Sequence, residues 1–242
     1  MNQQKKSNLL YSNLAVQKKI FQTDKAGRYK WQKGKEKLIF NDIKKKLIFK
    51  KNDKFLDIGC GWGPLTDLLV NFCQKKKVSI TLCDIPLIIK ILKNKYKNFE
   101  NIKYISKEFQ KTKINQKYDK ILCYSVIQCV DSPLKFSKKI ILLLNKEGKT
   151  LIGDIPNINK KYRFLKSSFG IKYEKMSLKN NIKYKNFSDF KKKTKQNKKL
   201  NDDYILNILN FCRKNNRSSN ILSQNPKLPF SFTREDILIE EF

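Results

Sequence analysis

A glycine-rich segment in the first third of the chain carries the clearest chemical signal. Residues 55–63 read Phe-Leu-Asp-Ile-Gly-Cys-Gly-Trp-Gly, and Pro64 follows. Glycines between a strand and a helix let the backbone approach a ligand closely, with N–H groups directed at its polar atoms. Dinucleotide-binding folds use Gly-x-Gly-x-x-Gly at such a turn, but here Pro64 takes the position of the third glycine. The spacing therefore argues against NAD or FAD.

A carboxylate ends the second apolar run of the chain. Residues 78–85 read Val-Ser-Ile-Thr-Leu-Cys-Asp-Ile, so Asp84 stands at the end of a predicted strand. A carboxylate beside a binding cleft can accept hydrogen bonds from both ribose hydroxyls of an adenosine. Asp84 could also serve as a helix N-cap ahead of Pro86, and the two roles are compatible.

The hydrophobic lead-in, Asp57, the three glycines and the downstream Asp84 together resemble the first motifs of class I S-adenosylmethionine-dependent methyltransferases. The resemblance covers residues 36–156 and, by the order of elements, residues 200–242. It implies S-adenosylmethionine as the cofactor. The residues that it implies at the cofactor are Asp57, Gly59, Cys60, Gly61, Gly63, Asp84, Ile85, Glu108, Phe109 and Tyr124.

The later cofactor residues come from looser matches to the same family. Lys107-Glu108-Phe109 occupies the place of the family's Gly-Asp-hydrophobic triplet, which touches the edge of the adenine. Residues 118–122, Tyr-Asp-Lys-Ile-Leu, resemble the family's fourth strand, after which Tyr124 would emerge at the cleft. Ile85 stands where the family packs an apolar side chain on the adenine.

Methyl transfer to a hydroxyl needs an aligned acceptor and a group that removes its proton. The chain has no histidine, so the base would be a carboxylate, lysine or tyrosine. Asp154 is the first catalytic candidate because it ends the fifth predicted strand, at the edge where ligands bind in open α/β sheets. A loop-capping aspartate is an equally good interpretation of Asp154. Asp131 is the second candidate, although Asp131-Ser132-Pro133 also resembles a helix start.

The absence of certain motifs narrows the acceptor. Amino-methylating DNA and RNA enzymes carry an (Asn/Asp)-Pro-Pro-(Tyr/Phe) motif after the fourth strand, where this chain reads Tyr124-Ser125-Val126-Ile127. A small-molecule or sugar hydroxyl is therefore the predicted acceptor. The residues Gly-Asp-Ile-Pro-Asn at 153–157 and the C-terminal segment 233–239 also resemble methyltransferases encoded among bacterial surface-polysaccharide genes. An RNA methyltransferase and a non-catalytic nucleotide-binding Rossmann module remain as alternatives.

The elements around these residues alternate between strands and helices. Strands are predicted at 54–59, 78–85, 102–105, 118–124 and 149–155, and helices at 35–50, 65–72, 87–96, 133–144 and 200–214. Two further strands are predicted at 220–224 and 236–242. This order predicts a Rossmann-like α/β fold: a seven-stranded, mostly parallel sheet with helices on both faces. The resemblance to the methyltransferase family implies that the last strand is antiparallel.

The predicted domain organisation follows from where the alternation of strands and helices begins and where it is interrupted. Residues 1–35 are predicted as an N-terminal arm and residues 36–242 as the methyltransferase domain. Residues 157–199 have weak periodicity and many Lys, Tyr, Phe and Ser residues, which predicts an insertion. Because it follows the fifth strand, we expect the insertion to form a lid over the acceptor site, together with residues 29–31.

Composition sets limits on the class of protein. With 40% apolar and 31% charged residues, the chain suits a globular protein. No apolar run approaches the length needed to span a bilayer, and a cytoplasmic location is expected. No Cys-x-x-Cys pair occurs among the six cysteines, so no metal site is predicted.

A formal charge of +33 suggests nucleic acid as a partner. Nucleic-acid readers favour arginine, however, and the lysines here are spread along the chain. Lysine, asparagine, isoleucine and phenylalanine all have A/T-rich codons, so a biased genome could produce this charge. Nucleic acid therefore stays a less favoured partner than a small molecule. The arginines are Arg28, Arg163, Arg213, Arg217 and Arg234.

Overall fold

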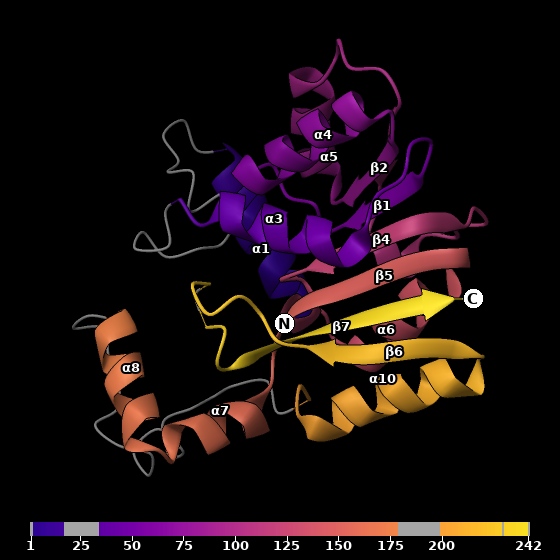
Figure 1. Ribbon diagram of the computed structural model, residues 1–242. Coiled ribbons are helices and arrows are strands. Elements are labelled where there is room, and N and C mark those ends of the chain that lie inside the picture. The colour runs from indigo at the N-terminus through magenta and orange to yellow at the C-terminus, as the bar shows by residue number, and fades with distance from the viewer. Residues whose placement is uncertain (1, 17–33, 179–198, 229, 242) are drawn as a thin grey trace.

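The computed structural model describes residues 2–16, 34–178, 199–228 and 230–241. Its centre is one seven-stranded sheet (Figure 1). The strands are β1 (Lys54–Ile58), β2 (Ser79–Asp84), β3 (Ile102–Ser106), β4 (Tyr118–Tyr124), β5 (Leu144–Pro156), β6 (Arg217–Leu222) and β7 (Arg234–Glu241). Their order across the sheet is β3-β2-β1-β4-β5-β7-β6. The strands β1 to β5 are parallel, and β7 runs antiparallel to both of its neighbours, as the sequence predicted.

Helices cover both faces of this sheet (Figure 1). One face carries α3 (Glu36–Leu47), α4 (Pro64–Lys76) and α5 (Pro86–Lys95), and the other carries α6 (Pro133–Leu142) and α10 (Asp202–Lys214). Along β4, Ile121 packs on the α6 side, Leu122 on the α3 side and Cys123 on the α6 side again. This alternation leaves the central strands apolar on both faces, as expected of parallel strands between two helical layers.

Proline residues begin three of these helices. Pro64, Pro86 and Pro133 each occupy the first turn, where the missing N–H costs no hydrogen bond. Asn201 begins α10 by accepting a hydrogen bond from the Tyr204 N–H at 2.9 Å. Because the helices start directly after the strand ends, their N-termini lie at the carboxyl edge of the sheet.

Several element boundaries differ from the sequence prediction. β5 starts at Leu144 instead of residue 149, because Leu144 pairs with Tyr118 through a bulged register. β6, at Arg217–Leu222, starts three residues before the predicted strand does and ends two residues before it does, since Arg217 pairs with Glu241. These pairings join residues far apart in sequence, and local propensity does not encode them.

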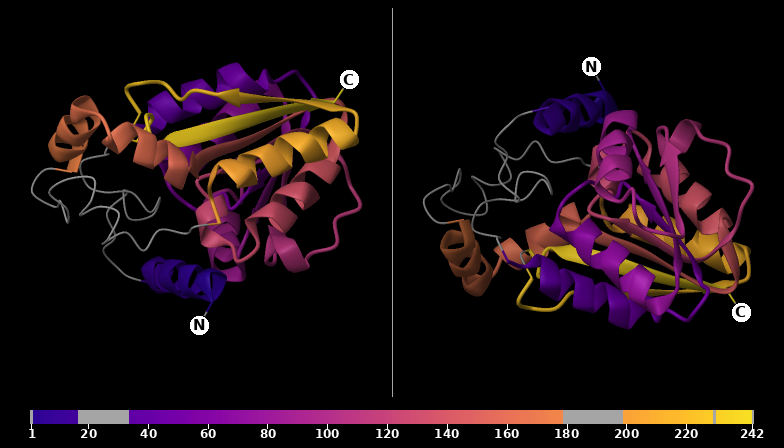
Figure 2. Two further views of the ribbon diagram at one scale, coloured as in Figure 1. Left: turned by 90° about the horizontal axis from the view of Figure 1, so that it is seen from below. Right: turned by 90° about the horizontal axis from the view of Figure 1, so that it is seen from above.

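Three helices lie in segments for which no helix was predicted. They are α1 (Gln3–Val16) in the N-terminal segment, and α7 (Ile158–Leu165) and α8 (Ser168–Leu178) in the predicted insertion. Figure 2 shows α1 at the periphery of the molecule and α8 standing away from the sheet. No residue of α1 is buried, so a hydrophobic pattern could not have revealed this helix. Among the described residues, no helix is long and apolar enough to cross a membrane.

Candidate cofactor and acceptor site

The glycine turn between β1 and α4 has a backbone that other residues adopt only with strain. Gly59 and Gly61 have φ of 68° and 61°, in the left-handed region. The Gly59 N–H donates to the Cys83 carbonyl at 2.8 Å, which fixes the turn beside β2. A Cβ at Gly59 would lie 2.5 Å from Val126 Cγ2. Glycine at position 59 is therefore required by both the backbone angle and the approach of the loop after β4.

Asp84 ties the end of β2 to this glycine turn. One carboxylate oxygen accepts from the Gly61 N–H at 2.8 Å, and the other accepts from the Ile85 N–H at 2.7 Å. Burial raises the pKa of Asp84 to about 6, although these two hydrogen bonds oppose the rise. Each oxygen keeps a further lone pair that can accept a hydroxyl from a ligand.

Asp57, near the end of β1, is a second carboxylate at the same edge. Its side chain is only 4% exposed, and within the described part of the chain it has no hydrogen-bond donor. Burial, together with the charge of Asp84, raises the pKa of Asp57 to about 8. Two neighbouring carboxylates, one of them without a donor, are stabilised by a cation that binds between or beside them.

A pocket opens over the glycine turn, with an empty volume of about 840 Å³ counted to its mouth. None of the described residues that line it is a lysine or arginine, although the chain carries 54 of them. The lining residues are Ser7, Asn8, Tyr11, Gly59, Cys60, Gly61, Trp62, Gly63, Leu65, Thr66, Asp84, Ile88, Tyr124, Ser125, Val126 and Cys129. Such a pocket fits a positively charged ligand such as S-adenosylmethionine better than a dinucleotide, whose phosphates are negative.

The helix α1 forms one wall of this pocket, which the sequence did not indicate. The ring of Tyr11 packs edge-on against Trp62 with 6.4 Å between ring centroids. Asn8 donates to Glu108 at 2.9 Å, and the Gln4 N–H donates to Asp131 Oδ1 at 3.1 Å. Asp131 thus accepts a hydrogen bond from the first turn of α1.

The structure brings together most, but not all, of the residues predicted at the cofactor. Six of them line the pocket: Gly59, Cys60, Gly61, Gly63, Asp84 and Tyr124. Asp57, Ile85, Glu108 and Phe109 do not, and Ile88 lines it one helical turn after Ile85. Glu108 bonds Asn8 and Lys111, whereas Phe109 is buried against Phe136 with 5.0 Å between centroids.

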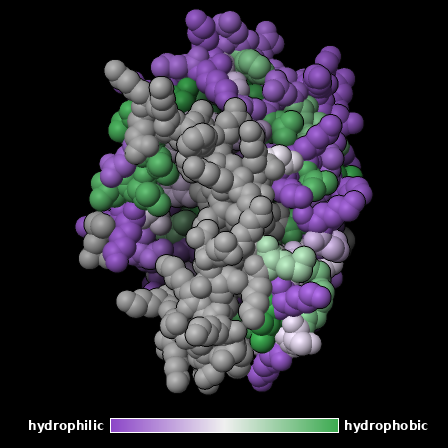
Figure 3. Space-filling model, turned by 90° about the vertical axis from the view of Figure 1, so that its left-hand side faces the viewer, coloured by the Kyte–Doolittle hydropathy of each residue, from purple (hydrophilic) through white to green (hydrophobic). Residues whose placement is uncertain are grey.

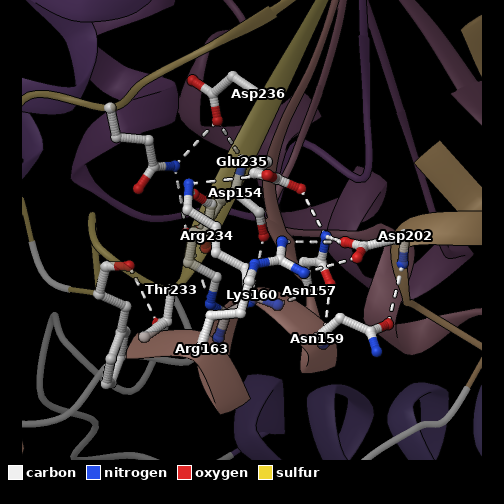
Figure 4. A network of polar contacts seen from close by, with 12 residues as sticks. Asp154, Asn157, Asn159, Lys160, Arg163, Asp202, Thr233, Arg234, Glu235 and Asp236 are labelled. Carbon is white, nitrogen blue, oxygen red and sulfur yellow. Dashed lines mark hydrogen bonds and ion pairs between the residues drawn. The ribbon is translucent and has the colours of Figure 1, made fainter. Parts of the chain in front are cut away.

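Asp154 lies in β5, two residues before its end at Pro156, in a polar network with β7 (Figure 4). It has a φ of 58°, and its N–H donates to Asp236 Oδ1 at 2.8 Å. Asp236 is fully buried and pairs with Lys46 of α3 at 2.7 Å. The Asp154 carbonyl accepts from Arg234 Nη1 at 3.1 Å. The backbone at Asp154 is thus held by two residues of β7, one of which, Asp236, also pairs with Lys46 of α3.

Gly153 connects this network to the pocket. It pairs with Tyr124 across β4 and β5, and its carbonyl accepts from the Ser125 N–H at 3.0 Å. A Cβ on Gly153 would lie 2.5 Å from the Tyr124 ring and 3.4 Å from Asp236 Oδ1. Asp154 therefore follows directly after a residue that contacts the pocket wall.

A second group of contacts in Figure 4 fixes the start of the predicted insertion. Asn157 caps α7 and donates to Asp202 and to Glu235, both at 2.8 Å. Arg163 donates to both carboxylate oxygens of Asp202, at 2.6 and 3.2 Å. These bonds hold α7 against the start of α10 and against β7.

An aromatic cluster then holds α8 to α7 and to the loop before β7. Phe164 stacks on Phe232 with an interplanar angle of 2°, and Phe169 and Tyr173 of α8 pack on the same ring. These rings pack on one another more than on the core, which explains the weak sequence periodicity of this segment. The predicted lid residues Tyr29 to Trp31, Tyr184 and Phe187 lie outside the described residues.

Comparisons with known proteins agree with this geometry. A sequence model of a methyltransferase domain matches residues 49–221. The ribosomal RNA small subunit methyltransferase A of Borrelia garinii subsp. bavariensis is 33% identical over 154 residues, which are 58% of this chain and 53% of that protein. Its counterpart in Borreliella burgdorferi is 32% identical over the same length. The chain spans about half the length of the curated relatives it matches.

Solved structures share the fold at low sequence identity. The N-methyltransferase NodS of Bradyrhizobium japonicum WM9, in complex with S-adenosyl-L-homocysteine, superposes with a TM-score of 0.59 and 9% identity, covering 100% of this chain and 99% of that one. The magnesium protoporphyrin IX methyltransferase ChlM of Synechocystis PCC 6803, also with bound S-adenosylhomocysteine, gives a TM-score of 0.55 and 10% identity, covering 99% and 95%.

Proposed function

The chain belongs to the class I S-adenosylmethionine-dependent methyltransferases, and from this premise we propose that it methylates a hydroxyl group of a small molecule or sugar, with Asp154 as the base. The observation that carries the proposal is the position of Asp154. It follows Gly153, which contacts the Tyr124 wall of the pocket, and its backbone is fixed by Asp236. A carboxylate so placed is available to an acceptor that approaches the same wall.

We assign the cofactor to the pocket over the glycine turn. In this proposal the Asp84 carboxylate accepts the ribose hydroxyls, and Asp57 offers its negative charge to the positively charged part of the ligand. The turn at Gly59 and Gly61 lets the ligand approach the backbone closely. On one side of the pocket, Tyr11 of α1 excludes water. S-adenosylmethionine supplies an electrophilic methyl group on a sulfonium, which makes an in-line displacement possible.

Asp154 would remove the proton of the acceptor hydroxyl while the oxygen bonds to the methyl carbon. The chain has no histidine for this task. The hydrogen bonds at its N–H and carbonyl restrict the backbone of Asp154. Less conformational entropy is then lost when its carboxylate takes up the orientation that the reaction needs. A sugar of a surface polysaccharide is the finer form of the proposal. It rests on the resemblance of residues 153–157 and 233–239 to methyltransferases encoded among bacterial surface-polysaccharide genes.

We propose residues 157–199 as a lid for this acceptor. The described part of it, α7 and α8, continues directly from the end of β5, where Asp154 stands. The bonds of Asn157 and Arg163 fix α7, whereas α8 is held mainly by the aromatic cluster around Phe232. A lid that covers the acceptor would therefore move at α8 before it moves at α7.

Ribosomal RNA is the second candidate acceptor, favoured by the 33% identity to a ribosomal RNA methyltransferase. The charge of +33 is compatible with it, and Figure 3 shows a mostly hydrophilic described surface on one face. The residues after β4, Tyr124 to Ile127, do not form the motif of amino-methylating enzymes. Selective RNA binding that persists at physiological salt would favour this candidate, whereas binding that collapses there reflects only lysine charge.

One experiment separates the two acceptors. The protein is incubated with methyl-labelled S-adenosylmethionine and three fractions of a lysate: RNA, polysaccharide and small molecules. We expect label in the polysaccharide or small-molecule fraction, at least tenfold less of it with Asp154→Asn, and unchanged cofactor affinity. Asp203→Asn, an exposed carboxylate of α10, is the matched control. Label in RNA alone would overturn the proposal.

A further inference from the structure

Arg234, at the start of β7, uses little of its hydrogen-bonding capacity. Nη1 donates to the Asp154 carbonyl at 3.1 Å, and Nε lies 3.9 Å from Asp154 Oδ1, which is too long for a hydrogen bond. Within the described residues, no carboxylate accepts a hydrogen bond from this guanidinium. Its side chain is 20% exposed, so it is held in place yet reachable.

Two other arginines of this protein donate hydrogen bonds to carboxylates. Arg163 donates to both oxygens of Asp202, and Arg217 donates to Glu241 and to the Ile141 carbonyl. A guanidinium has five donors arranged to match the oxygens of a carboxylate or phosphate. Arg234 thus differs from Arg163 and Arg217, because its only contact with a carboxylate among the described residues is the 3.9 Å ion pair with Asp154, which is not a hydrogen bond.

The surroundings of Arg234 hold it in one orientation beside Asp154. Its guanidinium carbon lies 5.5 Å from the centre of the Phe230 ring, in the geometry of a cation–π contact. Lys160 donates to the Arg234 carbonyl at 2.8 Å, and Figure 4 shows Arg234 beside Asp154 and Lys160. Burial raises the pKa of the Cys129 thiol, which lines the cofactor pocket, and a hydrogen bond with Ser7 and the positive charge of Arg234 oppose this rise. The charge of Arg234 therefore acts on the pocket at Cys129.

We propose that Arg234 binds an oxyanion, a carboxylate or a phosphate, of the methyl acceptor. The inference rests on the proposed function, because it takes the side of the pocket near Asp154 as the acceptor side. The acceptor is then a small anionic molecule, such as a sugar acid or a sugar phosphate, whose hydroxyl faces Asp154 while its anion meets Arg234. The cofactor pocket itself holds no described arginine or lysine. The positively charged cofactor and the negatively charged acceptor would therefore bind at different places.

Alkylation of Cys129 by an anionic and by a neutral reagent tests whether Arg234 attracts anions. The test does not require the acceptor to be known. Iodoacetate and iodoacetamide form the same kind of thioether at the thiolate and both release iodide, but only iodoacetate is an anion. The ratio of their rates at Cys129, measured by peptide mass spectrometry, cancels any change in the thiolate fraction. We expect Arg234→Gln to lower this ratio by roughly three- to fivefold, which is the effect expected from removing one nearby charge in a water-exposed site. The ratio at Cys60, in the same pocket, should not change.

Two further variants keep the test interpretable. Arg234→Lys retains the positive charge but not the planar arrangement of donors in the guanidinium. We therefore expect a ratio between those of the wild type and Arg234→Gln. Arg163→Gln removes an exposed arginine that is already paired with Asp202 and should leave the ratio unchanged. If Arg163→Gln lowers the ratio as much as Arg234→Gln, the effect is general attraction to a basic surface and the proposal fails. It also fails if Arg234→Gln folds, by its thermal melt, and leaves the ratio unchanged.

Protection from iodoacetamide identifies the anion. Benzoate and phenyl phosphate, compared with benzyl alcohol at equal ionic strength, should slow alkylation of Cys129 in the wild type but not in Arg234→Gln. The better protector of the two shows whether a carboxylate or a phosphate is preferred. Protection by a short RNA but by neither small anion would overturn the proposal in favour of nucleic acid. These alkylation experiments do not measure methyl transfer. Their result can therefore be interpreted even if the labelling experiment described under the proposed function fails.

Discussion

The carboxylate of Asp84 accepts a hydrogen bond from the backbone N–H of Gly61 at 2.8 Å, which joins the end of β2 to the turn after β1. The contact places the predicted ribose-binding group and the predicted backbone cradle in one structural unit. A change in either residue should therefore affect the ligand more than the fold.

Asp84→Ala should weaken S-adenosylmethionine binding by about 1–3 kcal/mol, because hydrogen bonds to the ribose are lost. Isothermal titration measures this directly, with 1:1 binding expected for the wild type. Asp84→Asn separates charge from hydrogen bonding, since one amide oxygen can still accept from Gly61. If Asp84→Ala binds the cofactor as well as the wild type, the ribose lies elsewhere.

Gly61→Val should abolish cofactor binding and leave the fold largely intact. At φ 61° a β-branched residue is strained, and its side chain would stand where backbone and ligand approach each other. Gly34→Val is the matched control, because Gly34 also has a positive φ, of 81°, with open space around it. Binding is measured by titration and folding by circular dichroism. Normal binding by Gly61→Val would show that the glycine turn has been assigned to the wrong ligand.

The proton affinity of Asp57 predicts a pH dependence with a definite sign. Below pH 4 both folded and unfolded chains carry the proton, so Asp57 contributes nothing. Between pH 4 and about 8 the unfolded chain ionises while the folded one keeps its proton, so the free energy of unfolding falls as pH rises. Thermal melts without cofactor should therefore show a steeper loss of stability over this window in the wild type than in Asp57→Asn.

Cofactor binding should oppose this loss. A cationic ligand favours ionised Asp57, so binding near pH 7 should release protons, and affinity should rise from pH 6 to pH 8.5. Titration in buffers with different ionisation enthalpies counts the protons. Asp57→Asn should release fewer protons and show a flatter affinity profile. Equal proton release by the two proteins would rule out Asp57 as the linked group.

Trimming the insertion tests the lid. Replacing residues 168–198 by a short Gly-Ser linker removes α8 but keeps α7 with Arg163, the buried Leu165 and Leu200, and the Asn201 cap. We expect cofactor affinity to persist and methyl transfer to the labelled fraction to be lost. Phe169→Ser alone, in the aromatic cluster, should produce a smaller loss. If the trimmed protein transfers methyl groups normally, the acceptor site does not involve α8.

The sequence alone determined the sheet, the position of its glycine turn and the family. Each of these is encoded locally: the apolar runs of β1 to β5, the prolines at Pro64, Pro86 and Pro133, and the spacing from Asp57 to Gly63 need no knowledge of distant residues. The antiparallel final strand came from the resemblance to the family, whose members end with a helix and an antiparallel strand pair.

Only the tertiary structure decided which side chains meet. Asn8 reaches Glu108 across 100 residues, and Asp154 meets Asp236 across 82. The position of α1 at the pocket depends on such contacts, since the helix buries no residue of its own and has no pattern to predict its docking. The free donors of Arg234 are likewise a property of what surrounds the side chain. Hydrogen bonds between distant segments depend on the packed geometry of the whole chain, which residue types and spacing do not specify.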